Sequence, residues 1–214
     1  MSIEKYHALQ KRKPGIIGQE FYSKYAVLLP LVERNGEIQI LFEQRARELK
    51  KQPGEICFPG GRIESSDQDA AAAAVRETCE ELGLQEKDIT VIAPLDCLVT
   101  PFNVIIYPFL CEIKNFEHIH PNHGEVESVF CVPLEHLLSN PPLYHYIRLC
   151  LLPPEDFPYE LIPHGKEYDW REGIYPEYFY KWKEHVIWGI TARILHHFLS
   201  LHESLNSRKT DGRI

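Results

Sequence analysis

The feature that most constrains the fold is a short apolar strand, a glycine-rich break and a capped helix in direct succession. The strand ends at the Pro-Gly-Gly sequence of residues 59–61, where regular structure must break. The helix begins at Ser66 or Asp69, both good N-terminal caps, and contains five consecutive alanines. It ends at Leu82, because Gly83 occupies the position where a C-terminal glycine belongs. We therefore expect strand, loop and helix to form one unit.

A β-hairpin is expected upstream of this unit. Two apolar runs, 26–32 and 37–43, flank Asn35-Gly36, a dipeptide typical of two-residue turns between antiparallel strands. Further elements are expected along the chain: two strands within 89–114, a strand at 126–132, a short helix at 133–138 and an amphipathic helix at about 183–205. Strands and helices mixed in this order predict an α+β fold or an α/β/α sandwich.

The size and composition indicate one globular domain. The chain has 214 residues, of which 44% are apolar and 25% are charged. We expect a single domain over residues 24–202, preceded by an N-terminal arm at 1–23 and followed by a flexible tail at 203–214.

The charge and the cysteines limit the partners and the compartment. A net charge of −8 disfavours binding to nucleic acid or to an anionic membrane surface. No apolar run approaches the roughly 18–20 residues of a membrane span. The chain does not open on a secretory signal, and none of its six cysteines forms a CxxC pair. We therefore expect reduced thiols, a cytoplasmic location and a small-molecule partner, with a homodimer left open.

Three glutamates on the predicted helix indicate a metal site. Glu77, Glu80 and Glu81 have the spacing i, i+3, i+4, which places them on one helix face. An acidic helix face alone is more often simply solvated. Here, however, Gly60 and Gly61 allow the preceding loop to approach a ligand closely, so that a carbonyl group could point at the same ion. Carboxylate oxygens are the ligands that Mg²⁺ and Mn²⁺ prefer, so we expect one of these cations at the three glutamates and Gly60.

The segment from Gly61 to Leu84 resembles the signature of the Nudix hydrolases. Fifteen residues separate Gly61 from the sequence Glu-Thr-Cys-Glu-Glu-Leu-Gly-Leu, which begins at Glu77. The resemblance implies an α/β/α sandwich with a mixed β-sheet, and metal-dependent hydrolysis of a diphosphate linked to another moiety. One position departs from the pattern. Its outer glutamate falls on Asp67 when counted from the glycine and on Gln68 when counted from the arginine, so the loop carries one extra residue.

A second stretch resembles one branch of this family, the coenzyme A diphosphatases. The branch pattern is matched in spacing at Arg45, Lys50, Gly54 and Phe58, just before the glycine loop. Lysine stands at position 50 where arginine is usual, which keeps the charge but loses the bidentate fork toward phosphate. The resemblance implies that these four residues bind the substrate and that the products are 3′,5′-ADP and 4′-phosphopantetheine. Four cations within residues 45–51 would neutralise phosphate groups that lie nearby.

The resemblance also implies roles for individual residues in metal-assisted hydrolysis. We expect Glu77 and Glu81 to be direct metal ligands, and Glu80 to be a third ligand or the base that takes a proton from water. Arg76 is expected to orient a glutamate. The catalytic base varies between family members, so Glu125 is kept as an alternative.

Other interpretations remain open from the sequence. The chain could instead hydrolyse ADP-ribose or another nucleoside diphosphate derivative, because the signature reports the bond that is broken and not what is attached. It could also be a catalytically silent nucleotide-binding module, although the intact glutamates argue against this. Cys57 is expected to be a buried strand thiol and not a nucleophile. The aromatic stretch at 168–182 could line a substrate groove, but we favour packing in the core or between two copies of the chain.

Overall fold

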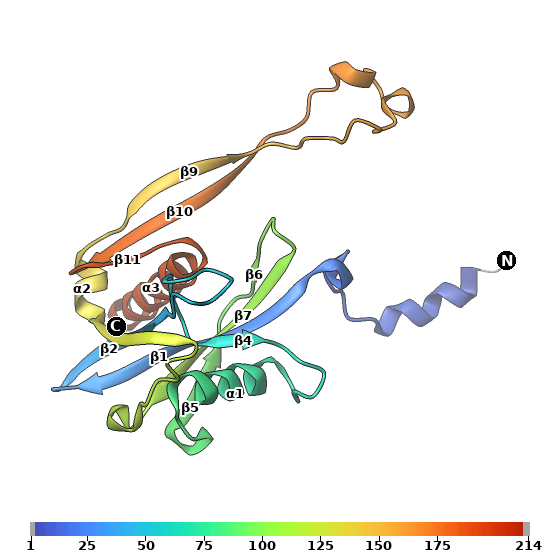
Figure 1. Cartoon of the computed structure of the whole chain (residues 1–214). Helices are drawn as coiled ribbons and strands as arrows, with labels where there is room; N and C mark the ends of the chain where they lie inside the picture. The colour runs from blue at the N-terminus through green and yellow to red at the C-terminus, as the bar shows by residue number, and fades with distance from the viewer. Residues whose placement is uncertain (1–2, 212–214) are drawn as a thin grey trace.

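The computed structural model describes residues 3–211, with side chains as far as residue 207. Its centre is an eight-stranded sheet (Figure 1). The strands are β1 (Ser23–Arg34), β2 (Glu37–Arg45), β3 (Ile56–Cys57), β4 (Gly60–Arg62), β5 (Ile89–Pro94), β6 (Leu98–Val99), β7 (Val104–Ile113) and β8 (Val126–Pro133). β1 is parallel to β7 and antiparallel to β2 and β4. The sheet is therefore mixed, as expected.

The expected hairpin is formed by β1 and β2. Arg34 faces Glu37 across a two-residue turn. Asn35 and Gly36 have φ angles of 53° and 76°, as a type I′ turn requires at both positions. Beyond the hairpin, β2 also pairs with β8 and β3, which brings its C-terminal end next to the glycine loop.

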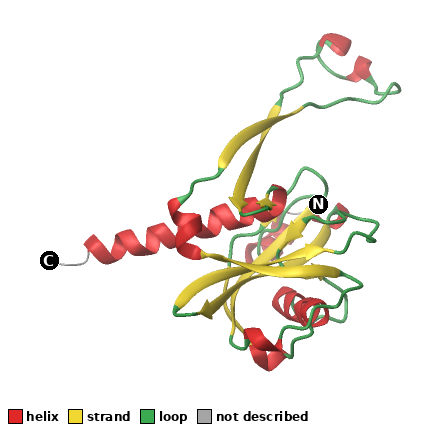
Figure 2. Ribbon diagram, turned by 60° about the vertical axis from the view of Figure 1, so that its left-hand side comes forward, coloured by secondary structure: helices red, strands yellow, loops and turns green. Residues whose placement is uncertain are grey.

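Helices cover both faces of the sheet (Figures 1 and 2). α1 (Ala70–Leu82) packs on the face that carries Leu28 and Leu41. α3 (Gly189–Asp211) and the short α2 (Leu134–Ser139) pack on the opposite face, which carries Leu29 and Phe42. Adjacent strand residues point to opposite faces, so each strand contributes to two separate apolar layers. The expected α/β/α sandwich is confirmed.

The caps of α1 are those expected from the sequence. The Asp69 carboxylate accepts a hydrogen bond from the backbone N–H of Ala72 at 2.9 Å. Gly83 ends the helix with a φ of 65°. The next segment is fastened to this end, because the backbone N–H of His120 donates to the Leu82 carbonyl at 2.9 Å. Both ends of the helix that carries the glutamates are therefore fixed.

The predicted helix at 183–205 is wrong at its beginning. Residues His185–Ile187 form a strand, β11, whose Ile187 faces Tyr180. Lys183 has a φ of 52° in the tight turn that precedes this strand. A short apolar run does not distinguish a strand from a helix, which explains the difference. At the other end, α3 continues to Asp211, because no glycine or proline interrupts it, so the expected tail is helical between residues 203 and 211.

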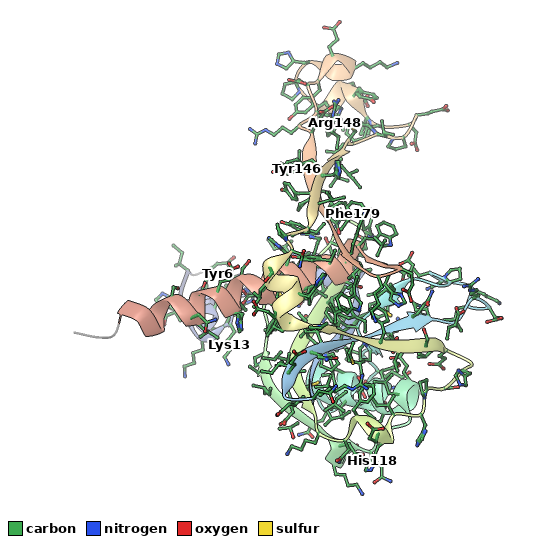
Figure 3. All side chains as sticks on the ribbon, turned by 90° about the vertical axis from the view of Figure 1, so that its left-hand side faces the viewer. Tyr6, Lys13, His118, Tyr146, Arg148 and Phe179 are labelled. Atoms are coloured by element: carbon green, nitrogen blue, oxygen red, sulfur yellow. The ribbon has the colours of Figure 1, made fainter. Side chains whose placement is uncertain are left out.

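A two-stranded ribbon projects from the sandwich (Figures 1 and 2). It consists of β9 (Leu143–Leu149) and β10 (Gly173–Trp182), which are antiparallel. Their connection contains the 3-10 turns η5 (Tyr159–Leu161) and η6 (Gly165–Glu167). Figure 3 shows Tyr146 and Arg148 on the projecting part and Phe179 at its base. Part of the aromatic stretch is packed, since Tyr175 and Tyr180 are buried, whereas Tyr168 is exposed.

The N-terminal segment lies outside the sheet. It contains the 3-10 helix η1 (Ile3–Lys11), which has no buried residue, and η2 (Gln19–Phe21). Within residues 3–211, none of the helices is both long and apolar enough to span a lipid bilayer.

Candidate active site

Two glycines bring the loop into contact with α1 and with the sheet. A Cβ atom on Gly61 would lie 2.2 Å from Cδ of the Glu77 carboxyl group, so a side chain there would displace this carboxyl group. Gly60 has a φ of +142°, and a Cβ atom on it would lie 2.3 Å from the carbonyl oxygen of Ala26. The loop backbone is thus held between β1 and the Glu77 carboxylate.

Glu81 points inward from α1 and is held by the same loop. Its Oε2 accepts a hydrogen bond from the backbone N–H of Gly60 at 2.8 Å, and the residue is only 4% exposed. Burial raises the pKa of this carboxyl well above its ordinary value, and the nearby charge of Glu43 raises it further. The Gly60 hydrogen bond and the charge of Arg45 act in the opposite direction. Glu81 is therefore a buried carboxyl group beside a second one.

Glu43 is the second buried carboxyl group, and the sequence analysis did not identify it as a site residue. It lies on β2, two residues after Leu41 and on the same face, and it is 1% exposed. Its Oε1 accepts a hydrogen bond from the Cys57 thiol at 3.2 Å, whereas Oε2 has no hydrogen-bond partner in the described part of the chain. Burial raises its pKa. The available signal was a charged residue on the strand face that packs against α1.

Arg45 lies beside these carboxyl groups and not on an exposed strip. Its guanidinium lowers the pKa of both Glu43 and Glu81, and it is half-buried with an Nε that has no partner among the described residues. The other basic residues of this stretch differ from it. Lys50 is exposed, and Arg47 is 74% exposed and pairs with Glu127.

Arg76 joins the loop to the glutamates of α1. Its Nε and Nη2 donate to the two carboxylate oxygens of Asp67 at 2.9 and 3.1 Å, and its Nη1 donates to Glu77 at 2.8 Å. The guanidinium lowers the pKa of Asp67. Asp67 is the residue reached by counting from Gly61, so the loop with one extra residue still supplies the partner of the arginine. Arg76 thus contacts a glutamate of the helix, and the orienting role expected for it stays a prediction.

The three helix glutamates have different surroundings. The side chain of Glu80 is 59% exposed and reaches Arg76 at 3.6 Å, whereas the side chain of Glu77 is 19% exposed. Only Glu81 is turned fully toward the sheet. The helical spacing therefore brings the glutamates to one side of α1, but at different depths.

Glu125 lies at the end of a loop that is fastened to α1. The backbone N–H of Asn122 donates to the Glu81 carbonyl at 2.8 Å, and the Glu125 carbonyl accepts from the N–H of Ala46 at 2.8 Å. The Glu125 side chain is exposed, and its charge raises the pKa of Glu43. This predicted alternative base is therefore within electrostatic reach of Glu43.

The two other residues predicted to bind the substrate, Gly54 and Phe58, lie in different surroundings. Gly54 has a φ of +71°, and its backbone N–H donates to the Arg45 carbonyl at 3.1 Å, so it shapes the loop between β2 and β3. Phe58 is 3% exposed and stacks on Phe42 with 5.0 Å between ring centroids. Its side chain packs in the apolar layer under α3, and the substrate role expected for it stays a prediction.

Cys57 is a strand thiol that supports Glu43. Burial and the charge of Glu43 raise the pKa of this thiol well above its ordinary value, so it stays neutral and donates its hydrogen bond. This agrees with a structural thiol and not with a nucleophile.

The residues around Glu43 and Glu81 fit a divalent cation. In the part of the chain whose side chains are described, no three Asp, Glu, His or Cys side chains are already gathered as a complete ligand set. Glu43 and Glu81 are nevertheless two buried carboxyl groups beside each other, and the charge of Glu77 also acts on Glu81. Carboxylate oxygens are the ligands that a hard divalent cation takes, and Glu43 Oε2 is left unpaired for one.

Comparison with known proteins gives matches at the level of a family. The family described as NUDIX domain matches residues 23–150. The peroxisomal coenzyme A diphosphatase NUDT7 of Mus musculus is 37% identical over 123 residues, which are 58% of this chain and 52% of the mouse protein. This chain thus spans about half the length of that relative.

A bacterial relative aligns over more of its length. The uncharacterized Nudix hydrolase NudL of Citrobacter koseri is 32% identical over 194 residues, which are 87% of this chain and 86% of that protein. Among solved structures, a binary complex of a C. elegans Ap4A hydrolase covers 55% of this chain and 84% of its own, with a TM-score of 0.45 and 21% identity.

Proposed function

Because this chain belongs to the NUDIX family, we propose that it hydrolyses the diphosphate bond of coenzyme A to 3′,5′-ADP and 4′-phosphopantetheine, using Mg²⁺ or Mn²⁺. The observation that carries the proposal is the position of the buried carboxyl groups Glu43 and Glu81 beside the Gly60 loop. This loop follows the basic stretch of residues 45–51 in the sequence. The name of the mouse relative supports this choice of substrate.

The metal would be held by carboxylates that the fold has already oriented. Glu81 is fixed by the Gly60 amide, and Glu77 is fixed by Arg76, so little ordering remains when a cation binds. The cation, when bound, polarises a phosphate oxygen and lowers the pKa of water. The Arg76–Asp67 pair would keep Glu77 in the correct rotamer during turnover.

The proton of the attacking water requires an acceptor with access to solvent. Glu80, on α1, and Glu125, just before β8, are both exposed, and the charge of Glu125 acts on Glu43. In this proposal one of them takes the proton, because Glu43 and Glu81 are turned away from solvent.

The phosphate groups of the substrate would meet the cations of the loop after β2. Lys50 is exposed and free to contact a phosphate outside the metal site, such as the 3′-phosphate of coenzyme A. Arg45, beside the carboxylates, would act nearer the diphosphate. A metal-bound diphosphate and a second phosphate would then be neutralised from two sides.

Product analysis tests the proposal. The purified chain is incubated with coenzyme A and Mg²⁺ or Mn²⁺ in ¹⁸O-labelled water, in parallel with ADP-ribose, and Glu81→Gln serves as a control for contaminating activity. Appearance of 3′,5′-ADP and 4′-phosphopantetheine with wild type alone is the expected result. Intact coenzyme A together with efficient cleavage of ADP-ribose would overturn the substrate and keep the reaction class. No turnover of any diphosphate would favour the nucleotide-binding alternative.

A further inference from the structure

We propose that Glu43, which lies on β2 outside the glycine loop and the helix motif, is a further ligand of the divalent cation, together with Glu77 and Glu81. The inference rests on the metal requirement in the proposed function. It adds a carboxylate from the sheet to those supplied by the helix, so that the cation would be held between two elements of the fold.

The position of Glu43 on β2 directs its side chain toward α1. β2 pairs with β3 so that Glu43 faces Cys57, and the chain then continues directly into the loop whose Gly60 amide binds Glu81. Leu41, on the same face of β2, packs in the apolar layer with α1. Glu43 therefore points into the space between β2 and the C-terminal half of α1, where Glu81 also points.

One carboxylate oxygen of Glu43 is buried and has no hydrogen-bond partner among the described residues. The residue is 1% exposed, and its Oε2 has no hydrogen-bond partner in the described part of the chain. Nor does any lysine or arginine of the described residues lie within 4.0 Å of the oxygens of Glu43 or Glu81 as an ion-pair partner. An isolated buried carboxylate is costly, and a buried polar atom without a partner calls for a specific explanation.

Of the partners that could satisfy this oxygen, a divalent cation fits the surroundings best. A water molecule or an amide could donate a hydrogen bond to this oxygen, but neither carries a charge that would offset the repulsion between the Glu43 and Glu81 carboxylates when both are ionised. Arg45 is close enough to influence both carboxyl groups, yet its Nε is itself unpaired. A divalent cation supplies two charges and takes several oxygen ligands, so it meets both requirements at once.

The Cys57 thiol supports this assignment. It occupies Oε1 of Glu43 at 3.2 Å and so fixes the rotamer, which leaves Oε2 as the free oxygen. A hydrogen bond of this kind to a ligating carboxylate is a usual way to orient a metal ligand. Glu43 would then bind through one oxygen only.

Direct metal binding, measured without substrate, tests the proposal. Mn²⁺ affinity is determined by calorimetry for wild type, Glu43→Gln and the matched control Glu127→Gln, whose residue is on β8 and pairs with Arg47 on the surface. We expect Glu43→Gln to weaken Mn²⁺ binding by about tenfold or more, and Glu127→Gln to match wild type. Without metal, Glu43→Gln should melt at the same temperature as wild type or higher, because it removes a buried charge.

A second measurement does not depend on the variant. Crystals of the wild-type chain are soaked in Mn²⁺ and the anomalous peak is located. A peak within about 2.5 Å of Glu43 Oε2 supports the proposal. Equal Mn²⁺ affinity of wild type and Glu43→Gln, or a peak beyond direct ligand distance of Glu43, would overturn it. A chain that binds Mn²⁺ through Glu43 but leaves coenzyme A intact would overturn the proposed substrate and keep this inference.

Discussion

The backbone N–H of Gly60 donates a hydrogen bond to the Glu81 carboxylate at 2.8 Å, across 21 residues of sequence. This bond joins the glycine loop to the helix at the point where both meet the sheet. It also gives Glu81 a fixed direction before any ligand arrives. The relationship makes Glu81 the residue whose replacement should affect metal binding most directly.

We predict that Glu81→Gln abolishes metal-dependent hydrolysis while the fold is retained. Glutamine keeps the shape of the side chain but removes the ligand charge, and it relieves the repulsion with Glu43. Rates with saturating Mn²⁺ and thermal melts of the metal-free protein measure the two effects. Retention of more than about a tenth of the wild-type kcat, a loss below about 1.4 kcal/mol, would contradict the metal role.

We predict that Gly61→Ala reduces hydrolysis strongly with little loss of stability, because the added methyl group would displace the Glu77 carboxyl group, the end of a flexible side chain, from its position beside Arg76. Gly15→Ala is the matched control, since the nearest atom to its new Cβ is 3.6 Å away. Urea unfolding and kcat measure the effects. If Gly61→Ala and Gly15→Ala have the same kcat, the close approach of Gly61 to Glu77 is not needed for hydrolysis.

We predict that Asp67→Asn lowers kcat by about 10–100-fold without unfolding the chain, since Arg76 would lose its charged partner and Glu77 its fixed orientation. Asp156→Asn, an exposed residue in the connection of the projecting ribbon, is the control. Steady-state kinetics and circular dichroism distinguish a loss of positioning from a loss of structure. Unchanged kcat in Asp67→Asn would show that the extra loop residue has made this contact dispensable.

The sequence predicted the parts of the fold that are encoded locally. Asn35-Gly36 determines its turn by its own backbone preferences, and Asp69 and Gly83 cap α1 through contacts within a few residues. The boundary between β11 and α3 could not be read in this way, because β11 exists only through its pairing with Tyr180 and its neighbours on β10.

The same distinction holds for the candidate site. The helix glutamates and the glycine loop were identified because they are close in sequence and match a known pattern. Glu43 was not identified, because a single acidic residue in an apolar strand does not reveal that Glu81 faces it. The depth of Arg45 and the core position of Phe58 likewise depend on the pairing of β2 with β3 and on the packing under α3.

We predict that the metal-free protein loses stability as the pH rises. The pKa of Glu81 and that of Glu43 are raised above the ordinary value of 4.5, so the folded state holds more protons than the unfolded state above that pH. Stability therefore falls from about pH 5 upward through the raised pKa values. Melts at several pH values should show this slope in wild type and a shallower one in Glu81→Gln. Equal slopes would indicate that the pair is not the source.

The last prediction separates the two cations of the upstream motif. Lys50 is exposed, so Lys50→Ala should weaken binding of coenzyme A more than binding of its 3′-dephospho form. Arg45 lies beside Glu43 and Glu81, so Arg45→Ala should impair hydrolysis of both substrates to the same extent. Lys166→Ala, in the connection of the projecting ribbon, is the control for a general change in net charge.

Michaelis constants for both substrates at several salt concentrations provide the measurement, because a lost phosphate contact also reduces the salt dependence of affinity. Equal losses for the two substrates in Lys50→Ala would show that this lysine does not recognise the 3′-phosphate. A selective loss in Arg45→Ala would show that its guanidinium reaches that phosphate, and that its electrostatic effect on the buried carboxyl groups is secondary. Either result would show which of the two residues contacts the 3′-phosphate, and neither would change the proposed metal ligands.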